Sequence, residues 1–123
     1  MRIHETTEDY LERILMIKEE KGQVHGVDIA SALDISKPTV SIAMKKLQDE
    51  GLINIDSSKN ITLTDEGLTI AAKTYEKHNL VARILMKLGV GSEQAFIDSC
   101  HIEHCLSDES FDAIKKYAKS KGI

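Results

Sequence analysis

A helix-turn-helix is indicated by residues 34–51, which read DISKPTVSIAMKKLQDEG. Ser36 is a favoured N-cap residue, and Pro38 follows in the first helical turn, where its missing N–H costs nothing. The apolar residues that recur at helical spacing before Gly51 are Val40, Met44 and Leu47. This stretch therefore predicts a turn followed by a helix with one apolar face.

Two helices are expected before this stretch and a hairpin after it. Apolar residues follow helical spacing in residues 6–21, and a shorter helix is expected at 27–33. Apolar and polar residues alternate in 52–56 and 60–63 around the polar turn at 57–59, which predicts two short strands. Helix, short helix, turn, helix and hairpin together predict a winged helix-turn-helix.

Three more helices are expected in the remainder of the chain. The first runs from about 64 to 87, the second from 92 to 106 and the third from 107 to 119. The predicted fold is mainly α. A winged helix-turn-helix domain at 1–74 is followed by an α-helical domain at 75–123.

The composition indicates a soluble, helical chain. Of its 123 residues 29% are charged and 4% are aromatic, and Trp is absent. No apolar run approaches the roughly 18 residues that a membrane span needs, and residues 1–7 lack the apolar core of a signal peptide. We therefore expect a cytoplasmic protein with no membrane partner, whose two cysteines are thiols. The net charge of −4 argues against a nucleic-acid partner, but the charges are unevenly distributed.

The helix predicted after the turn is basic although the whole chain is acidic. Residues 36–48 contain three lysines and no acidic residue, and small hydroxyl residues occupy the end that enters the major groove in this motif. A helix N-terminus also favours phosphate. The alternative is that the lysines form a solvated face and the module binds protein. The predicted DNA-binding residues are Ser36, Lys37, Pro38, Thr39, Ser41, Lys45, Lys46 and, at the tip of the wing, Lys59.

Three candidate ligands near the C-terminus predict part of a metal site. Cys100, Glu103 and His104 stand at positions i, i+3 and i+4, so they share one face of a helix. Burying a thiol, a carboxylate and an imidazole together without a cation is costly. The trio therefore favours a transition metal, although Cys100 alone is compatible with a small buried side chain.

Three further residues have the chemistry of metal ligands, but each has an ordinary structural explanation. Asp9 could form a capping box with Thr6 or pair with Arg13, and Glu12 could be a surface charge. His78 shares a predicted helix face with apolar residues, which is typical of a core histidine. Taken alone, none of the three identifies a site.

Five short motifs follow one another along the chain: TTEDYLE at 6–12, SKPTVS at 36–41, LQDEGLI at 47–53, LTDEG at 63–67 and CHIEH at 100–104. In content and order they closely resemble the diphtheria-toxin-repressor and manganese-transport-regulator family of metal-dependent transcriptional repressors. The resemblance covers essentially the whole chain, and it implies the short form, without the SH3-like third domain of longer members.

The resemblance implies a metal site that is a hybrid of two branches of the family. Cys100 departs from the manganese-type branch, which has a carboxylate there, and resembles the iron-type branch. Ala82 and Phe96 stand where the ancillary iron-type site would need ligands. The expected cofactor is Fe²⁺ or Mn²⁺, with Co²⁺, Zn²⁺ or Ni²⁺ possible in vitro, at one or two ions per subunit. The residues that match manganese-type ligands are Asp9, Glu12, His78, Glu103 and His104.

The sequence thus predicts a metal-responsive repressor that binds a near-palindromic operator as a homodimer. The expected DNA-binding domain is 1–74, and the expected α-helical metal-binding and dimerisation domain is 75–123. The last two helices carry more apolar residues than one long helix can cover, which favours a two-fold partner. An enzyme is not expected, because His101 and His104 lack the i, i+4 spacing of metalloprotease motifs. The remaining alternative is a winged-helix regulator that senses redox state or a small molecule through a cysteine, without metal.

Overall fold

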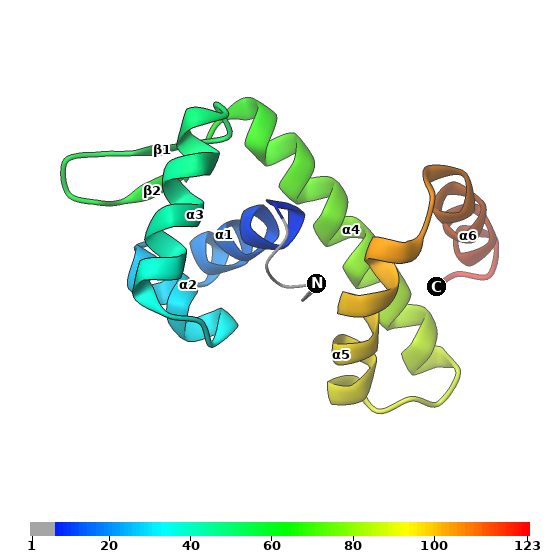
Figure 1. Ribbon diagram of the computed structural model, residues 1–123. Helices are drawn as coiled ribbons and strands as arrows, with labels where there is room; N and C mark the ends of the chain where they lie inside the picture. The colour runs from blue at the N-terminus through cyan, green and yellow to red at the C-terminus, as the bar shows by residue number, and fades with distance from the viewer. Residues whose placement is uncertain (1–6) are drawn as a thin grey trace. The chain divides into compact units, whose positions relative to one another are not determined.

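The computed structural model describes residues 7–123, which fall into two compact units that divide between Lys73 and Thr74 (Figure 1). Thr6, where the sequence places the start of the first helix, lies outside the described residues. The division between the units falls within the long helix α4 (Asp65–Lys87), beside the boundary predicted between residues 74 and 75.

The first unit is a winged helix-turn-helix, which confirms the predicted fold class (Figure 1). Three helices are followed by an antiparallel hairpin in which Asn54 pairs with Thr62. The elements before α4 are α1 (Thr7–Lys21), α2 (Gly26–Leu33), α3 (Lys37–Asp49), β1 (Ile53–Ile55) and β2 (Ile61–Leu63).

Local hydrogen bonds set both ends of α3. At its start the Ser36 hydroxyl accepts the backbone N–H of Thr39 at 3.3 Å, which makes Ser36 the N-cap as predicted. At its end Gly51 adopts a left-handed φ of 76°, and the N–H of Leu52 donates to the carbonyl of Leu47 at 3.0 Å. Glycine adopts this conformation without a Cβ clash, so Gly51 ends the helix and turns the chain into β1.

The hairpin is hydrogen bonded to the segment between α1 and α2. The N–H of Ile61 donates to the carbonyl of Val24 at 2.7 Å, and the N–H of Val24 donates to Oδ1 of Asn60 at 3.2 Å. At the tip, Oδ1 of Asp56 accepts the N–H groups of Ser58 and Asn60. This Asp-centred turn fixes the position of Lys59, whose backbone is left-handed.

The core of the first unit is mainly aliphatic. Leu11, Ile14, Ile29 and Ile53 are almost fully buried in it and belong to α1, α2 and β1. Because the core residues of α3 are those at the predicted helical spacing, α3 turns its lysines away from the core. The α3 residues in this core are Val40, Met44 and Leu47.

The second unit consists of the later part of α4, then α5 (Ser92–Ile102), the 3₁₀ helix η2 (Glu103–Cys105) and α6 (Asp108–Ser120). The sequence predicts one helix from 92 to about 106, but the α-helix ends at Ile102 and a single tighter turn follows. Such 3₁₀ turns are common at helix ends, where the last carbonyls lack α-helical partners.

The core of the second unit is smaller and joins α4 to α6. Leu80, Phe111 and Ala118 are buried together. Phe111 of α6 is only 3% exposed, so this apolar side chain is covered without a second subunit. None of the helices formed by residues 7–123 combines the length and apolar character that crossing a membrane requires.

We expect Gly67→Ala to destabilise the protein, because a Cβ at Gly67 would overlap the backbone carbonyl oxygen of Leu52. That carbonyl cannot move freely, since it accepts the N–H of Thr64 at 3.1 Å. The free energy of unfolding, measured by urea denaturation, should fall by about 1 to 3 kcal/mol.

Gly26→Ala is the matched control, because a Cβ at Gly26 would make only an ordinary 3.8 Å contact with Val40. It should leave the free energy of unfolding unchanged or slightly raised, as expected for Ala in a helix. Equal stabilities of the two variants would show that the hairpin-to-α4 junction does not need glycine.

Candidate metal centre and nucleic-acid interface

His78 is the centre of a polar cluster inside the second unit. It lies on α4 and is 2% exposed. Its Nδ1 atom is 3.2 Å from Oε2 of Glu103 and 3.4 Å from Sγ of Cys100. Its ring packs against that of Phe96 in a T-shaped arrangement, with the ring centroids 4.4 Å apart. Two of the predicted ligands on the α5–η2 segment therefore converge on one nitrogen of a third.

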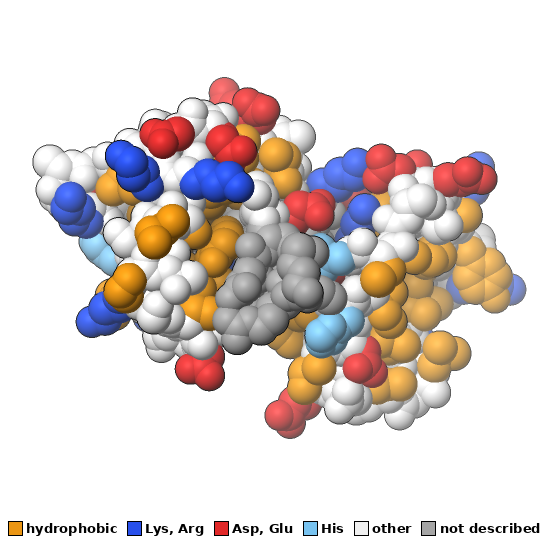
Figure 2. Space-filling view, viewed as in Figure 1, with side chains coloured by type: hydrophobic (Ala, Val, Ile, Leu, Met, Phe, Trp, Pro, Cys, Tyr) orange, Lys and Arg blue, Asp and Glu red, His pale blue; other side chains and the backbone are white. Residues whose placement is uncertain are grey.

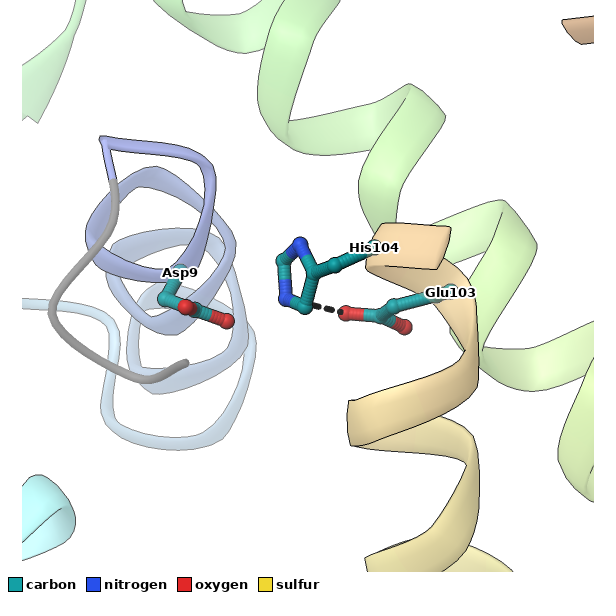
Figure 3. Close-up of side chains that lie close together, drawn as sticks. All are labelled: Asp9, Glu103 and His104. Atoms are coloured by element: carbon teal, nitrogen blue, oxygen red, sulfur yellow. Dashed lines mark ion pairs between the residues drawn. The ribbon is translucent and has the colours of Figure 1, made fainter. Parts of the chain in front are cut away.

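Glu103 links this nitrogen to a second imidazole. Oε1 of Glu103 lies 3.4 Å from Nε2 of His104 (Figure 3, which also labels Asp9 of α1). The Glu103 side chain is 1% exposed and that of His104 is 12% exposed. The structure thus brings together four of the six predicted ligands in one unit, and the change from α5 to η2 does not separate them.

The donor set of this cluster fits a divalent transition metal. Two imidazoles, one carboxylate and one thiol supply nitrogen, oxygen and sulfur donors. Donors that share an ion with bonds of about 2.0 to 2.3 Å lie roughly 3 to 4 Å apart, which is the spacing found around His78 and Glu103. The buried carboxylate of Glu103 and the half-buried thiol of Cys100 would also gain from a nearby positive charge.

Asp9 and Glu12 lie on α1, in the first unit, three residues apart. They are 7% and 5% exposed, so Glu12 is not the surface charge considered as an alternative. Their role as ligands stays a prediction. His101 and Cys105, which neighbour these ligands in sequence, are both exposed.

The predicted DNA-reading residues of α3 and the wing are all exposed. Figure 2 shows lysine or arginine side chains over this part of the first unit. A groove of about 350 Å³ runs between α3 and the hairpin, and Lys37, Lys45 and Lys59 all line it. Two candidates also have a local structural role, because the hydroxyls of Ser36 and Thr39 hydrogen bond at 2.7 Å.

Ile42 is a candidate contact that the sequence reasoning missed. It lies on α3 between the predicted DNA-reading residues and is 74% exposed. The signal was present in the sequence, because Ile42 falls two residues from both Val40 and Met44 and so lies off the apolar face. A large aliphatic side chain held in water on this helix is suited to apolar contact with a base.

Comparison with known proteins identifies both parts of the chain. Residues 2–61 match the family model described as iron dependent repressor, N-terminal DNA binding domain. Residues 64–120 match the model described as iron dependent repressor, metal binding and dimerisation domain. The second match agrees with the expected metal cofactor.

Relatives with similar sequences are transcriptional regulators. The transcriptional regulator MntR of Escherichia coli O6:H1 is 36% identical over 118 residues, covering 96% of this chain and 76% of the relative. An uncharacterised HTH-type transcriptional regulator of Methanocaldococcus jannaschii is 36% identical over 113 residues, covering 90% of each chain. These relatives confirm the prediction that the chain is not an enzyme.

Solved structures give the same result. The manganese regulator SloR superposes with a TM-score of 0.80 at 30% identity, covering 93% of this chain and 54% of its own. The metal-dependent transcriptional regulator MtsR superposes with a TM-score of 0.85 at 30% identity, covering 94% of this chain and 54% of its own. The chain thus spans about half the length of these two structures. With both family models matched in order, the chain belongs to the iron-dependent repressor family, the same diphtheria-toxin-repressor and manganese-transport-regulator family that its motifs resemble.

Proposed function

We propose that this chain is a metal-responsive DNA-binding repressor that controls genes of metal-ion homeostasis in the cytoplasm. The observation that carries the proposal is the cluster in which half-buried Cys100 and His104 lie beside buried His78 and Glu103. That cluster lies in a chain whose other unit is a winged helix-turn-helix with a basic third helix. A metal-loaded cluster and a DNA-reading unit are the two parts that such a switch requires.

The proposed cofactor is Fe²⁺ or Mn²⁺, at one or two ions per subunit. When bound, it supplies a positive charge that neutralises buried carboxylates and a set of directed bonds between its ligands. We expect Asp9 and Glu12 to complete the ligand set, because both are buried carboxylates on one face of α1. Metal would then restrain the DNA-reading unit against the metal-binding unit. The full proposed set is Asp9, Glu12, His78, Cys100, Glu103 and His104.

The proposed active form is a homodimer on a near-palindromic operator in double-stranded DNA. Figure 2 shows hydrophobic side chains gathered over α5 and α6, among which Phe96, Ile97 and Tyr117 are exposed. An almost wholly apolar groove of about 400 Å³ includes Tyr117 and Ile102. Exposed apolar surface of this kind favours a second copy. Two copies related by a two-fold axis would place their α3 helices in successive major grooves.

The switch predicts that metal tightens DNA binding. Starting from chelated protein and an operator selected from random DNA, addition of Mn²⁺, Fe²⁺ or Co²⁺ should lower the dissociation constant about 5-fold to 150-fold, the usual range for allosteric coupling. Fluorescence anisotropy measures this change. Glu103→Gln should abolish most of it, because it removes the charge that lies between His78 and His104.

Glu109→Gln is the matched control for this assay, since Glu109 is an exposed carboxylate on α6. It should respond to metal like the wild type. An operator affinity that is the same in chelator and in saturating metal would show that the wild-type protein is not a metal switch.

Cys100 should determine metal preference, because a thiolate favours softer ions than a carboxylate does. We expect Cys100→Glu to lower the affinities for Zn²⁺ and Co²⁺ relative to Mn²⁺, measured by competition with a chromophoric chelator. The thiolate-to-Co²⁺ charge-transfer absorption should disappear in Cys100→Ser and persist in Cys105→Ser, because Cys105 is exposed and outside the cluster.

A different set of variant effects on regulation would support the alternative function, a winged-helix regulator that works without metal. If Cys100→Ser abolishes regulation while Glu103→Gln and His104→Ala leave it intact, the protein senses redox state or a small molecule rather than metal. The absorption test separates the two cases, because only a metal ligand produces the charge-transfer band.

Ile42 should contribute to operator sequence preference through contact with a thymine methyl group. Replacing the contacted thymine by uracil removes one methyl and should weaken wild-type binding by about 0.8 kcal/mol, or roughly fourfold. Ile42→Ala should bind both operators equally. Leu88→Ala, which shortens a similarly exposed side chain in the second unit, should discriminate like the wild type. Discrimination retained by Ile42→Ala would place this side chain away from the bases.

A further inference from the structure

Ser99 is a fully buried hydroxyl beside the metal centre, and neither the sequence motifs nor the predicted ligand set assigns it a role. It lies on α5 and has no exposed surface. Its Oγ atom is 2.9 Å from the backbone carbonyl oxygen of Phe96 and 3.5 Å from Nε2 of His78. Ser99 therefore contacts the nitrogen of His78 that faces away from Cys100 and Glu103.

The direction of these two hydrogen bonds follows from the chemistry of the partners. A carbonyl oxygen only accepts, so the shorter contact places the single hydroxyl hydrogen of Ser99 on the carbonyl of Phe96. A serine side chain commonly makes this bond within its own helix. The lone pairs of Oγ are then left to accept, and at 3.5 Å they face Nε2 of His78.

We propose that Ser99 is a positioning residue that accepts the Nε2–H of His78, so that Nδ1 is the metal-binding atom. This inference rests on the proposed function. Nδ1 is the nitrogen that lies 3.2 Å from Glu103 and 3.4 Å from Cys100, so it is the one that faces the other donors. A ligating imidazole needs an acceptor for its other N–H, and that acceptor fixes its tautomer and its orientation.

The neighbours of His78 favour opposite positions for its imidazole proton, which makes this acceptor important. The carboxylate of Glu103 favours a proton on Nδ1, whereas Ser99 favours a proton on Nε2. Metal binding through Nδ1 requires the proton to be on Nε2. Ser99 lowers the cost of reaching it, while the ring of Phe96 restrains the imidazole from another side.

The test uses Zn²⁺ as a diamagnetic probe with full-length, ¹⁵N-histidine-labelled protein. In the wild type, long-range ¹H–¹⁵N spectra should show Zn²⁺ on Nδ1 of His78 and a slowly exchanging Hε2 proton. Ser99→Ala should bind Zn²⁺ about 10-fold to 100-fold more weakly, the usual effect of removing the partner of a ligating histidine, with Hε2 shifted or exchanging fast. The urea midpoint of the metal-free protein should change little.

Two further variants distinguish the hydroxyl from simple packing. Ser99→Thr keeps the hydroxyl and adds a buried methyl, so it should retain near-wild-type Zn²⁺ affinity even if its urea midpoint falls. Ser110→Ala, which removes an exposed hydroxyl on α6, should match the wild type in both measurements.

The failure of this inference is distinguishable from the failure of the proposed function. If the wild type binds Zn²⁺ while Ser99→Ala binds it equally well, or if Zn²⁺ lies on Nε2, the role of Ser99 is wrong and the metal switch stands. Loss of affinity in Ser99→Thr equal to that in Ser99→Ala also overturns it. A wild-type protein that binds no Zn²⁺, Mn²⁺, Fe²⁺ or Co²⁺ overturns the proposed function and this inference together.

Discussion

The burial of Glu103 against His78 is the constraint on which the organisation of the second unit depends. Their side chains are 1% and 2% exposed, and the carboxylate lies between two imidazoles at 3.2 and 3.4 Å. A buried carboxylate costs several kcal/mol unless charge or hydrogen bonds compensate it. Removal of either imidazole would therefore leave the buried carboxylate of Glu103 with less compensation. The cluster is therefore best understood as one electrostatic unit, whose polarity is explained by a cation.

This constraint also accounts for the local structure around it. Ser99, Cys100 and Glu103 must reach His78 within five residues, and they do so across the point where α5 ends and η2 begins. The hydroxyl contacts Nε2, while the thiol and the carboxylate contact Nδ1. Residues 99–103 thus contact both nitrogens of the His78 ring. The segment supplies the orientation of the imidazole as well as the donors beside it.

The predictable features of the fold are those with a local physical cause. Ser36 and Ser107 cap helices because a serine before a helical run accepts an orphan N–H, and this pattern is visible in sequence. The end of the α-helix at Ile102 depends on packing, which apolar spacing constrains only partly, whereas the outward position of Ile42 follows from its place off the apolar face of α3. The role of Ser99 could not be predicted, because it depends on a neighbour 21 residues away. Sequence spacing alone indicates that Cys100, Glu103 and His104 lie together, whereas His78 is assigned to the metal site only by the family resemblance.

The acidic net charge does not conflict with a DNA-reading surface. At physiological ionic strength the Debye length is about 8 Å, so exposed charges beyond that distance are largely screened. The field that a phosphate meets at α3 is therefore set mainly by nearby side chains, and residues 36–48 contribute lysines without acidic residues. Lys59 adds a further charge at the wing, where the Asp56-centred turn fixes its backbone. The carboxylates that make the whole chain acidic would weaken long-range steering toward DNA, but they would leave the proposed short-range contacts at α3 intact.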